Sequence, residues 1–134
     1  MIIIIGHGNF ASGLKSSLNL IVGEFDFIKD IDFIEDKTPE NLKKELEGIV
    51  NAYSDEKIYI FTDLLGGTPF KISSELTLDY NNIEVFCGTN LPMLVESVMM
   101  TSLGCEIDVN NIKETGINSI NPKKKVVESL EEGI

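Results

Sequence analysis

The amino-acid sequence predicts an α/β protein in which four parallel strands form one sheet with helices on both faces. The first observation is an alternation: four short apolar runs are each followed by a segment with helical periodicity. The second is the placement of glycine and proline, since glycines follow three of the runs and a proline stands at the start of three of the helices. The third is the length of 134 residues, which fits a single domain over residues 1–134. Strand–helix alternation is typical of a parallel sheet.

The first two strands differ in their expected burial. Ile2–Ile5 is a continuous β-branched run, which is typical of a central parallel strand buried on both faces. Apolar residues then recur at helical spacing over residues 10–22, and Gly23 ends this helix. Polar residues interrupt the second strand, Phe27–Ile34, so we expect it to be less buried.

Two helices in the middle of the chain begin with a hydroxyl residue followed by proline. Thr38 precedes Pro39 and predicts a helix that continues to about Tyr53. The third strand, Ile58–Phe61, follows. Thr68 repeats the pattern, so we expect it to cap the next helix.

The last third of the chain gives weaker signals. Ile83–Cys87 is the fourth strand, and Asn90 caps a helix that includes Met99. Apolar residues between 109 and 117 indicate a further helix, and the segment 123–127 fits either a short edge strand or a helix. About the last 30 residues of the domain are therefore the least well defined.

The charge balance excludes several kinds of partner. The chain has 22 acidic and 11 basic residues, so its formal net charge is −11, and every basic residue is lysine. Nucleic acids and anionic lipid surfaces attract basic proteins, so we expect neither as a partner. The charge fits a basic protein partner or simply a solvated surface. Without arginine, any phosphate must be held without a guanidinium fork.

The cysteines and the apolar segments indicate a cytoplasmic protein. Cys87 and Cys105 are isolated, and one histidine cannot complete a zinc site, so we expect no metal. Lone cysteines fit a reducing compartment. The apolar run at the start is too short for a signal or membrane segment, so we expect no membrane insertion.

Three loops follow strand ends, over residues 6–9, 63–69 and 88–90. Wound sheets bind ligands at the carboxyl ends of strands, where the winding direction reverses. If the first and third strands flank that point, His7 and Asp63 project into one crevice. A carboxylate that accepts the Nδ1 proton fixes the tautomer and leaves Nε2 as a nucleophile.

The surroundings of this pair suit an anion. We expect Gly8 and Asn9, at the start of the first helix, to bind a phosphoryl group through backbone N–H groups. Gly67 belongs to a glycine pair that can form a backbone nest for oxygens. The hydroxyl of Thr68 either caps its helix or bonds a phosphoryl oxygen.

Two other interpretations use the same loops. Gly6-x-Gly8-x-x-Ala11 matches a dinucleotide fingerprint, with Glu35 or Asp36 as its acid, but the imidazole would lie inside the pyrophosphate loop. Asp63 is also placed like a phosphorylated aspartate, but such a site needs an acidic pair after the first strand to hold magnesium.

Three segments together resemble the mannose-family IIA domain of the bacterial phosphoenolpyruvate-dependent sugar phosphotransferase system (PTS): Ile2–Gly8, Asp63–Phe70 and Gly88–Leu94. The resemblance covers residues 1 to about 104. It implies an open sheet of order 2-1-3-4 and a homodimer. It also implies an extra C-terminal edge strand that is exchanged between subunits.

The resemblance implies a phosphoryl relay without a cofactor. His7 would accept a phosphoryl group from the phosphocarrier protein HPr and pass it to a IIB component, which serves membrane IIC and IID components. Asp63 would orient the histidine, and Thr68 would lie near the phosphoryl group. Lys71 stands where several members have asparagine. Two hypotheses remain beside it: a non-catalytic nucleotide-binding module, and a regulator that signals through its phosphorylation state.

Overall fold

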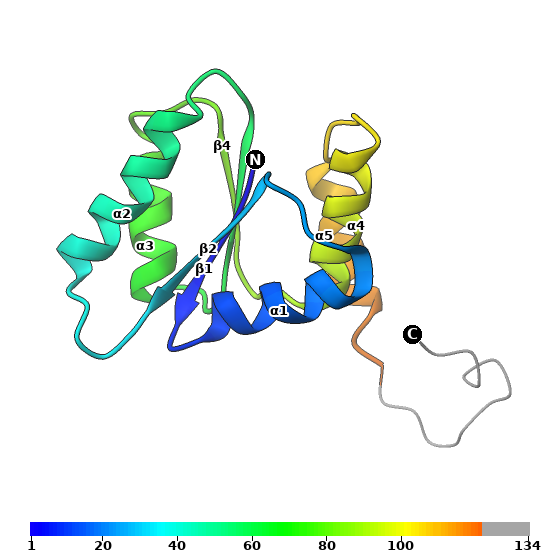
Figure 1. Ribbon diagram of the computed structural model, residues 1–134, viewed down its shortest axis with the longest axis horizontal. Helices are drawn as coiled ribbons and strands as arrows, with labels where there is room; N and C mark the ends of the chain where they lie inside the picture. Colours follow the sequence, from blue (N-terminus) through cyan, green and yellow to red (C-terminus); the bar gives the residue numbers. More distant parts are fainter. Residues whose placement is uncertain (122–134) are drawn as a thin grey trace, which may run out of the picture. The chain divides into compact units, whose positions relative to one another are not determined.

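The computed structural model describes residues 1–121 and contains the predicted four-stranded parallel sheet, in the order β2-β1-β3-β4 (Figure 1). The strands are β1 (Ile2–His7), β2 (Ile28–Phe33), β3 (Ile58–Thr62) and β4 (Ile83–Phe86). Every neighbouring pair is parallel. The fold class and the strand order are therefore as predicted.

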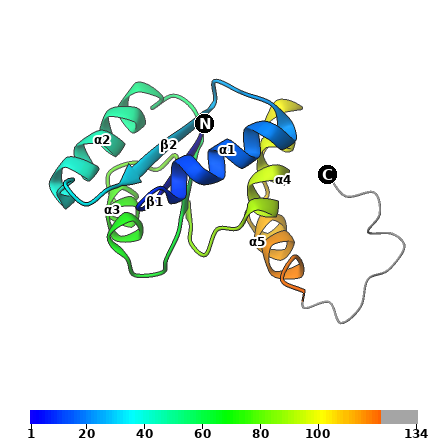
Figure 2. The same cartoon turned by 60° about the horizontal axis from the view of Figure 1, so that its bottom comes forward.

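The first compact unit of the chain, residues 1–89, contains the whole sheet. Helix α1 (Phe10–Val22) lies on one face, and α2 (Pro39–Ala52) and α3 (Thr68–Leu76) lie on the other (Figures 1 and 2). The four isoleucines of β1 are fully buried because helices cover both faces of this central strand. β2 is only partly buried, as its interspersed polar residues predict.

The core between the sheet and helices α2 and α3 follows from the alternation of side chains along a strand. Ile3 and Ile5 point into it, and Leu42 and Leu46 of α2 meet them there. Phe33, at the end of β2, is partly buried against this core. The carboxyl end of the sheet therefore rests on a packed layer.

The second compact unit, residues 90–134, is described as far as residue 121 and contains α4 (Leu91–Ser102) and α5 (Val109–Asn118). The side-chain oxygen of Asn90 accepts the N–H of Met93 at 3.3 Å and caps α4 as predicted. The Asn90 amide donates to the carbonyl of Gly116 at 3.0 Å and ties α4 to α5. The prediction of a single domain over residues 1–134 stays a prediction.

Some element boundaries differ from the sequence prediction. β3 extends one residue further, through Thr62, and β4 ends one residue earlier, at Phe86. The segment 123–127, with its predicted edge strand or helix, lies outside the described residues. Within the described residues, no helix combines the length and the apolar character that a membrane crossing requires.

Candidate functional site

The structure brings His7 and Asp63 together at the carboxyl end of the sheet. His7 is the last residue of β1, and Asp63 follows the last residue of β3, the neighbouring strand. The imidazole Nδ1 lies 2.7 Å from Asp63 Oδ2, and the backbone N–H of His7 donates to the same oxygen at 2.8 Å. The backbone N–H of Leu64 donates to the other oxygen at 2.7 Å. Both carboxylate oxygens are thus engaged.

This geometry assigns the tautomer of the neutral imidazole. An ionised carboxylate only accepts hydrogen bonds, so Nδ1 must carry the proton and Nε2 keeps its lone pair. Burial of Asp63 by itself raises its pKa, but the hydrogen bonds from His7 and from the N–H of Leu64 outweigh it. The net effect is a pKa of Asp63 below its ordinary value, so this carboxyl is ionised at neutral pH. The His7 side chain nevertheless remains 48% exposed.

Gly67 lies directly against the imidazole. A Cβ added to Gly67 would lie 2.9 Å from Cε1 of His7, which is closer than real contacts allow. Only glycine therefore lets the start of α3 approach the ring as it does here. The N–H of Gly67 donates to the carbonyl of Leu64 at 3.0 Å, so this amide is already engaged.

The expectation that Thr68 caps α3 is wrong. The N-cap residue is Gly67, whose carbonyl accepts the N–H of Lys71 at 2.9 Å, and no side chain caps this helix. Thr68 is instead the first helical residue, because the backbone already turns at Gly67. In the part of the chain that the structure describes, the hydroxyl of Thr68 and the N–H groups of Thr68 and Phe70 have no hydrogen-bond partner.

At the start of α1, other residues of the protein accept some of the backbone N–H groups that a helix leaves without a partner. The carboxylate of Asp32 accepts the N–H of Ser12 at 2.9 Å, and the N–H of Gly8 donates to the carbonyl of Phe33 at 2.8 Å. The backbone N–H groups of Asn9 and Phe10 have no partner among residues 1–121. Gly8 has a positive φ of 56°, which only glycine adopts readily. Among residues 1–121, the N–H groups left without a partner at this helix start are therefore those of Asn9, Phe10 and Ala11.

Sequence reasoning missed two residues at this site. Phe33 contacts the imidazole, with ring centroids 5.7 Å apart, and Asp32 occupies the start of α1. Both end the second strand, beside β1 in the sheet, and Phe33 is in register with His7. The order 2-1-3-4 together with the position of the strand end could have identified them.

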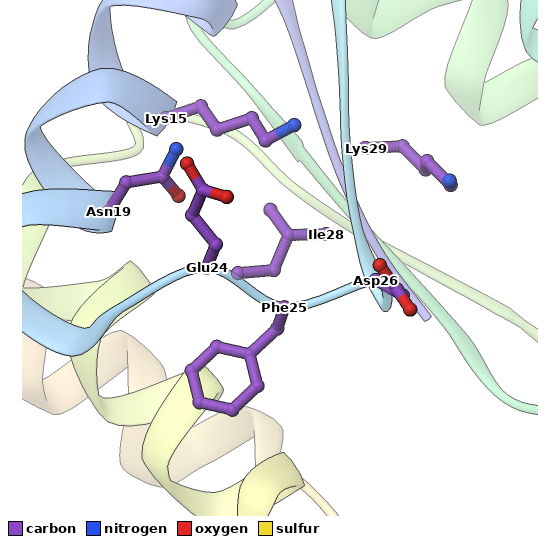
Figure 3. A pocket seen from close by; sticks show the side chains of 7 residues that line it. All are labelled: Lys15, Asn19, Glu24, Phe25, Asp26, Ile28 and Lys29. Carbon is purple, nitrogen blue, oxygen red and sulfur yellow. The ribbon is translucent and has the colours of Figure 1, made fainter.

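The two alternative sites fit the geometry less well. A dinucleotide fingerprint uses the first-turn N–H groups of α1 for the pyrophosphate, but the carboxylate of Asp32 already accepts the N–H of Ser12 there. Asp63 has both oxygens engaged by His7 and Leu64, which does not suit a phosphate acceptor. A cavity of about 370 Å³ lies elsewhere, beside the start of β2 (Figure 3). Its lining residues are Lys15, Asn19, Glu24, Phe25, Asp26, Ile28 and Lys29.

The fold and this site define a class of protein: a small α/β protein with an accessible histidine, oriented by a carboxylate, at the switch point of a parallel sheet. Residues 1–114 match the family model described as "PTS system fructose IIA component". The chain belongs to this family of PTS IIA components, which are phosphotransferase relay proteins.

Individual relatives agree with this membership. The chain is 33% identical, over 95 residues, to a sorbose-specific EIIA component from Lacticaseibacillus casei; the match covers 71% of this chain and 69% of that one. It is 33% identical to the mannose-specific EIIAB component of Escherichia coli K12 over 72% of this chain, but spans only 31% of that longer protein.

Among solved structures, an EIIA component from Streptococcus agalactiae is 38% identical and superposes with a TM-score of 0.75. The match covers 88% of this chain and 89% of that one. The likeness therefore extends from the sequence to the fold.

Proposed function

We propose that His7 carries the phosphoryl group in the sugar phosphotransferase relay. Nε2 attacks the phosphorus of phospho-HPr in line, and the donor's P–N bond breaks with its electron pair returning to the donor nitrogen. The new Nε2–P bond then breaks in the same way when the group passes to a IIB component. The 2.7 Å contact between His7 Nδ1 and Asp63 Oδ2 carries this proposal, because it leaves Nε2 as the nucleophile.

Asp63 stabilises the charge that develops on the imidazole. When Nε2 bonds to phosphorus, the ring becomes cationic, and the ionised carboxylate at Nδ1 offsets this charge. Its lowered pKa supports this role, since the hydrogen bonds around it favour the charged form at the relevant pH. Phosphoryl transfer depends mostly on positioning and electrostatics, so the proposal requires no cofactor.

Backbone donors take the place of arginine. The N–H groups of Asn9, Thr68 and Phe70 have no partner in the described part of the chain, and the hydroxyl of Thr68 is not used as a cap. We assign them to the phosphoryl oxygens. Gly8 and Gly67 contribute differently than the sequence suggested, because their own N–H groups are engaged. Gly8 supplies the positive φ of the turn after His7, and Gly67 supplies a close backbone approach to the imidazole.

The surface beside His7 supports a protein as donor. Leu64 and Leu65, in the loop after Asp63, are exposed, as is Ile34 at the end of β2. Exposed apolar side chains beside a reactive group are typical of a protein-docking surface. The net charge of −11 complements a basic donor. We further propose that the protein is a cytoplasmic homodimer and that it serves a membrane complex of IIC and IID components. Sedimentation equilibrium tests the homodimer, because it measures the mass of the assembly directly.

The test uses the single histidine of the chain. Incubation with phosphoenolpyruvate, enzyme I and HPr should produce a phosphoprotein that is stable to alkali and labile to acid. His7→Ala should accept no label while keeping the circular dichroism spectrum of the wild type. Asp63→Asn should react about 100-fold more slowly, as expected for loss of a group that orients a catalytic histidine. Label on His7→Ala would overturn the assignment.

The second half of the relay needs its own measurement. Purified phosphoprotein, freed of HPr, should lose its label to a mannose-family IIB component within seconds. Retention of the label over minutes with every IIB component offered, alongside normal uptake from HPr, would favour a regulator over a transport component.

A further inference from the structure

Phe33 lies against the imidazole ring at the end of β2. Its ring centroid is 5.7 Å from that of His7, with an angle of 55° between the ring planes. The two residues are in register across the parallel pair β1 and β2. Sheet pairing therefore places the aromatic ring beside the imidazole.

The backbone and the side chain of Phe33 are both held. Its carbonyl accepts the backbone N–H of Gly8, the residue directly after His7, at 2.8 Å. Its side chain is partly buried against the core that includes Ile5 and Leu42. Displacing the ring would uncover that core, so the aromatic ring forms a fixed wall rather than a mobile cover.

The imidazole thus has neighbours at three positions. Asp63 holds Nδ1, Gly67 lies against Cε1, and Phe33 packs against the ring. One hydrogen bond at Nδ1 leaves the ring free to tilt about that bond, because χ2 of histidine is a broad torsion. A packed neighbour removes this freedom.

We propose that Phe33 is a positioning residue for His7: its ring holds the imidazole in the orientation in which Nε2 points outward for in-line attack. This inference rests on the proposed function. Phosphoryl transfer requires the attacking nitrogen in line with the leaving group, and a displacement of 1 Å costs about 100-fold in rate. Phe33 acts through His7 and does not itself touch the reacting atoms.

The experiment compares Phe33→Ala, Phe33→Leu and Phe33→Tyr with Phe27→Ala. Phe27 is a matched control, because it is a partly buried phenylalanine just before the same strand and its ring stacks on Phe25 rather than on His7. Two readouts are taken for each variant. One is single-turnover phosphorylation by phospho-HPr; the other is the ¹⁵N chemical shifts of the ring nitrogens of the single histidine.

We expect Phe33→Ala to lower the rate at saturating donor by about 10- to 100-fold, with an unchanged half-saturation concentration. A tilted ring loses the alignment of its Nδ1–H with Asp63, so its ¹⁵N shifts should move part of the way from the Nδ1–H tautomer towards an average of both. Phe33→Tyr should restore at least half of the wild-type rate and the wild-type shifts. Phe33→Leu keeps the apolar packing without a flat ring, so its rate should lie between those of Phe33→Ala and Phe33→Tyr. It replaces the alanine variant in the test if that variant does not fold.

Two results would overturn the inference. The first is a Phe33→Ala variant that keeps the wild-type ¹⁵N shifts and a phosphorylation rate within twofold of the wild type. If the alanine variant does not fold, the same result in Phe33→Leu counts. The other is an equal loss in Phe27→Ala, which would indicate a general packing effect. If the wild-type protein takes no label, the proposed function fails, and the ¹⁵N shifts still decide whether Phe33 orients the ring.

Discussion

The Oδ2 atom of Asp63 accepts two hydrogen bonds from one residue, from the backbone N–H and from the ring of His7. This double contact fixes the imidazole relative to the main chain. Because Oδ1 also accepts the N–H of Leu64, the carboxylate cannot rotate without losing several bonds. At the scale of single residues, the reactivity of the histidine therefore depends on a carboxylate whose own orientation is fixed.

The lowered pKa of Asp63 predicts a pH dependence of stability. Burial opposes the ionised form, but the bonds from His7 and Leu64 prevail, so folding favours ionised Asp63. A group with a depressed folded pKa stabilises the protein above its ordinary pKa of 3.8, and this contribution is lost as the pH falls through the folded pKa. Asp63→Asn should lower the free energy of unfolding at pH 7 by about 1–3 kcal/mol.

Urea unfolding of the wild type and of Asp63→Asn between pH 7 and pH 2.5 measures this contribution. The difference between the two proteins should stay constant down to about pH 5 and then shrink. A difference that grows on acidification would contradict the predicted sign.

At the scale of elements, the loops between strands and helices bring the site together. Gly67 is the N-cap of α3, and its backbone also lies directly against the imidazole of His7. Asp32, at the end of β2, takes the N–H of Ser12 in the first turn of α1. The second contact stabilises the helix start where Asn9, the N-cap residue, provides no side-chain cap.

Gly67→Ala should separate activity from stability. The backbone at Gly67 has φ −72°, which alanine adopts without strain, but the new Cβ would lie 2.9 Å from Cε1 of His7. The ring must move, so we expect phosphorylation to slow by about 10- to 100-fold. The free energy of unfolding should change by about 1 kcal/mol or less.

Gly13→Ala is the control for this variant. Gly13 lies in α1, and an added Cβ there meets no atom within 4 Å. We expect a gain of about 0.5–1 kcal/mol in the free energy of unfolding and no change in rate. A rate for Gly67→Ala equal to that of Gly13→Ala would show that the close approach does not matter.

At the scale of the whole molecule, the charge of the chain affects encounter with a partner. The formal net charge is −11, from 22 acidic residues and 11 lysines. A charge of this size attracts a basic donor over distances up to the Debye length, which is about 10 Å at 0.1 M salt. The field raises the association rate more than it strengthens the final complex.

We therefore expect salt to slow phosphorylation at low donor concentration. Raising NaCl from about 0.05 M to about 0.5 M should reduce the second-order rate constant by about tenfold, because screening removes the steering. The rate at saturating donor should change little and provides the internal control. Stopped-flow quench measurements give both constants. A second-order rate constant that rises with salt would exclude an attractive encounter.

Much of the fold was predictable because the relevant signals are local. The helical periodicity of residues 10–22 gives α1 its observed bounds, Phe10–Val22. The unbroken isoleucine run correctly predicted a central strand. The error at Thr68 is also local: α2 begins at the proline of its Thr-Pro pair, whereas α3 begins one residue earlier, at the threonine of its pair, because Gly67 already supplies the turn.

The sequence by itself determined the strands and helices, the strand ends that carry His7 and Asp63, and the absence of arginine. Only the tertiary structure decided that Phe33 lies against the imidazole, and that Gly67 approaches it too closely for any side chain. The physical reason is the range of the interactions. Periodicity and capping act within a few residues, whereas sheet register brings His7 and Phe33 together across the chain.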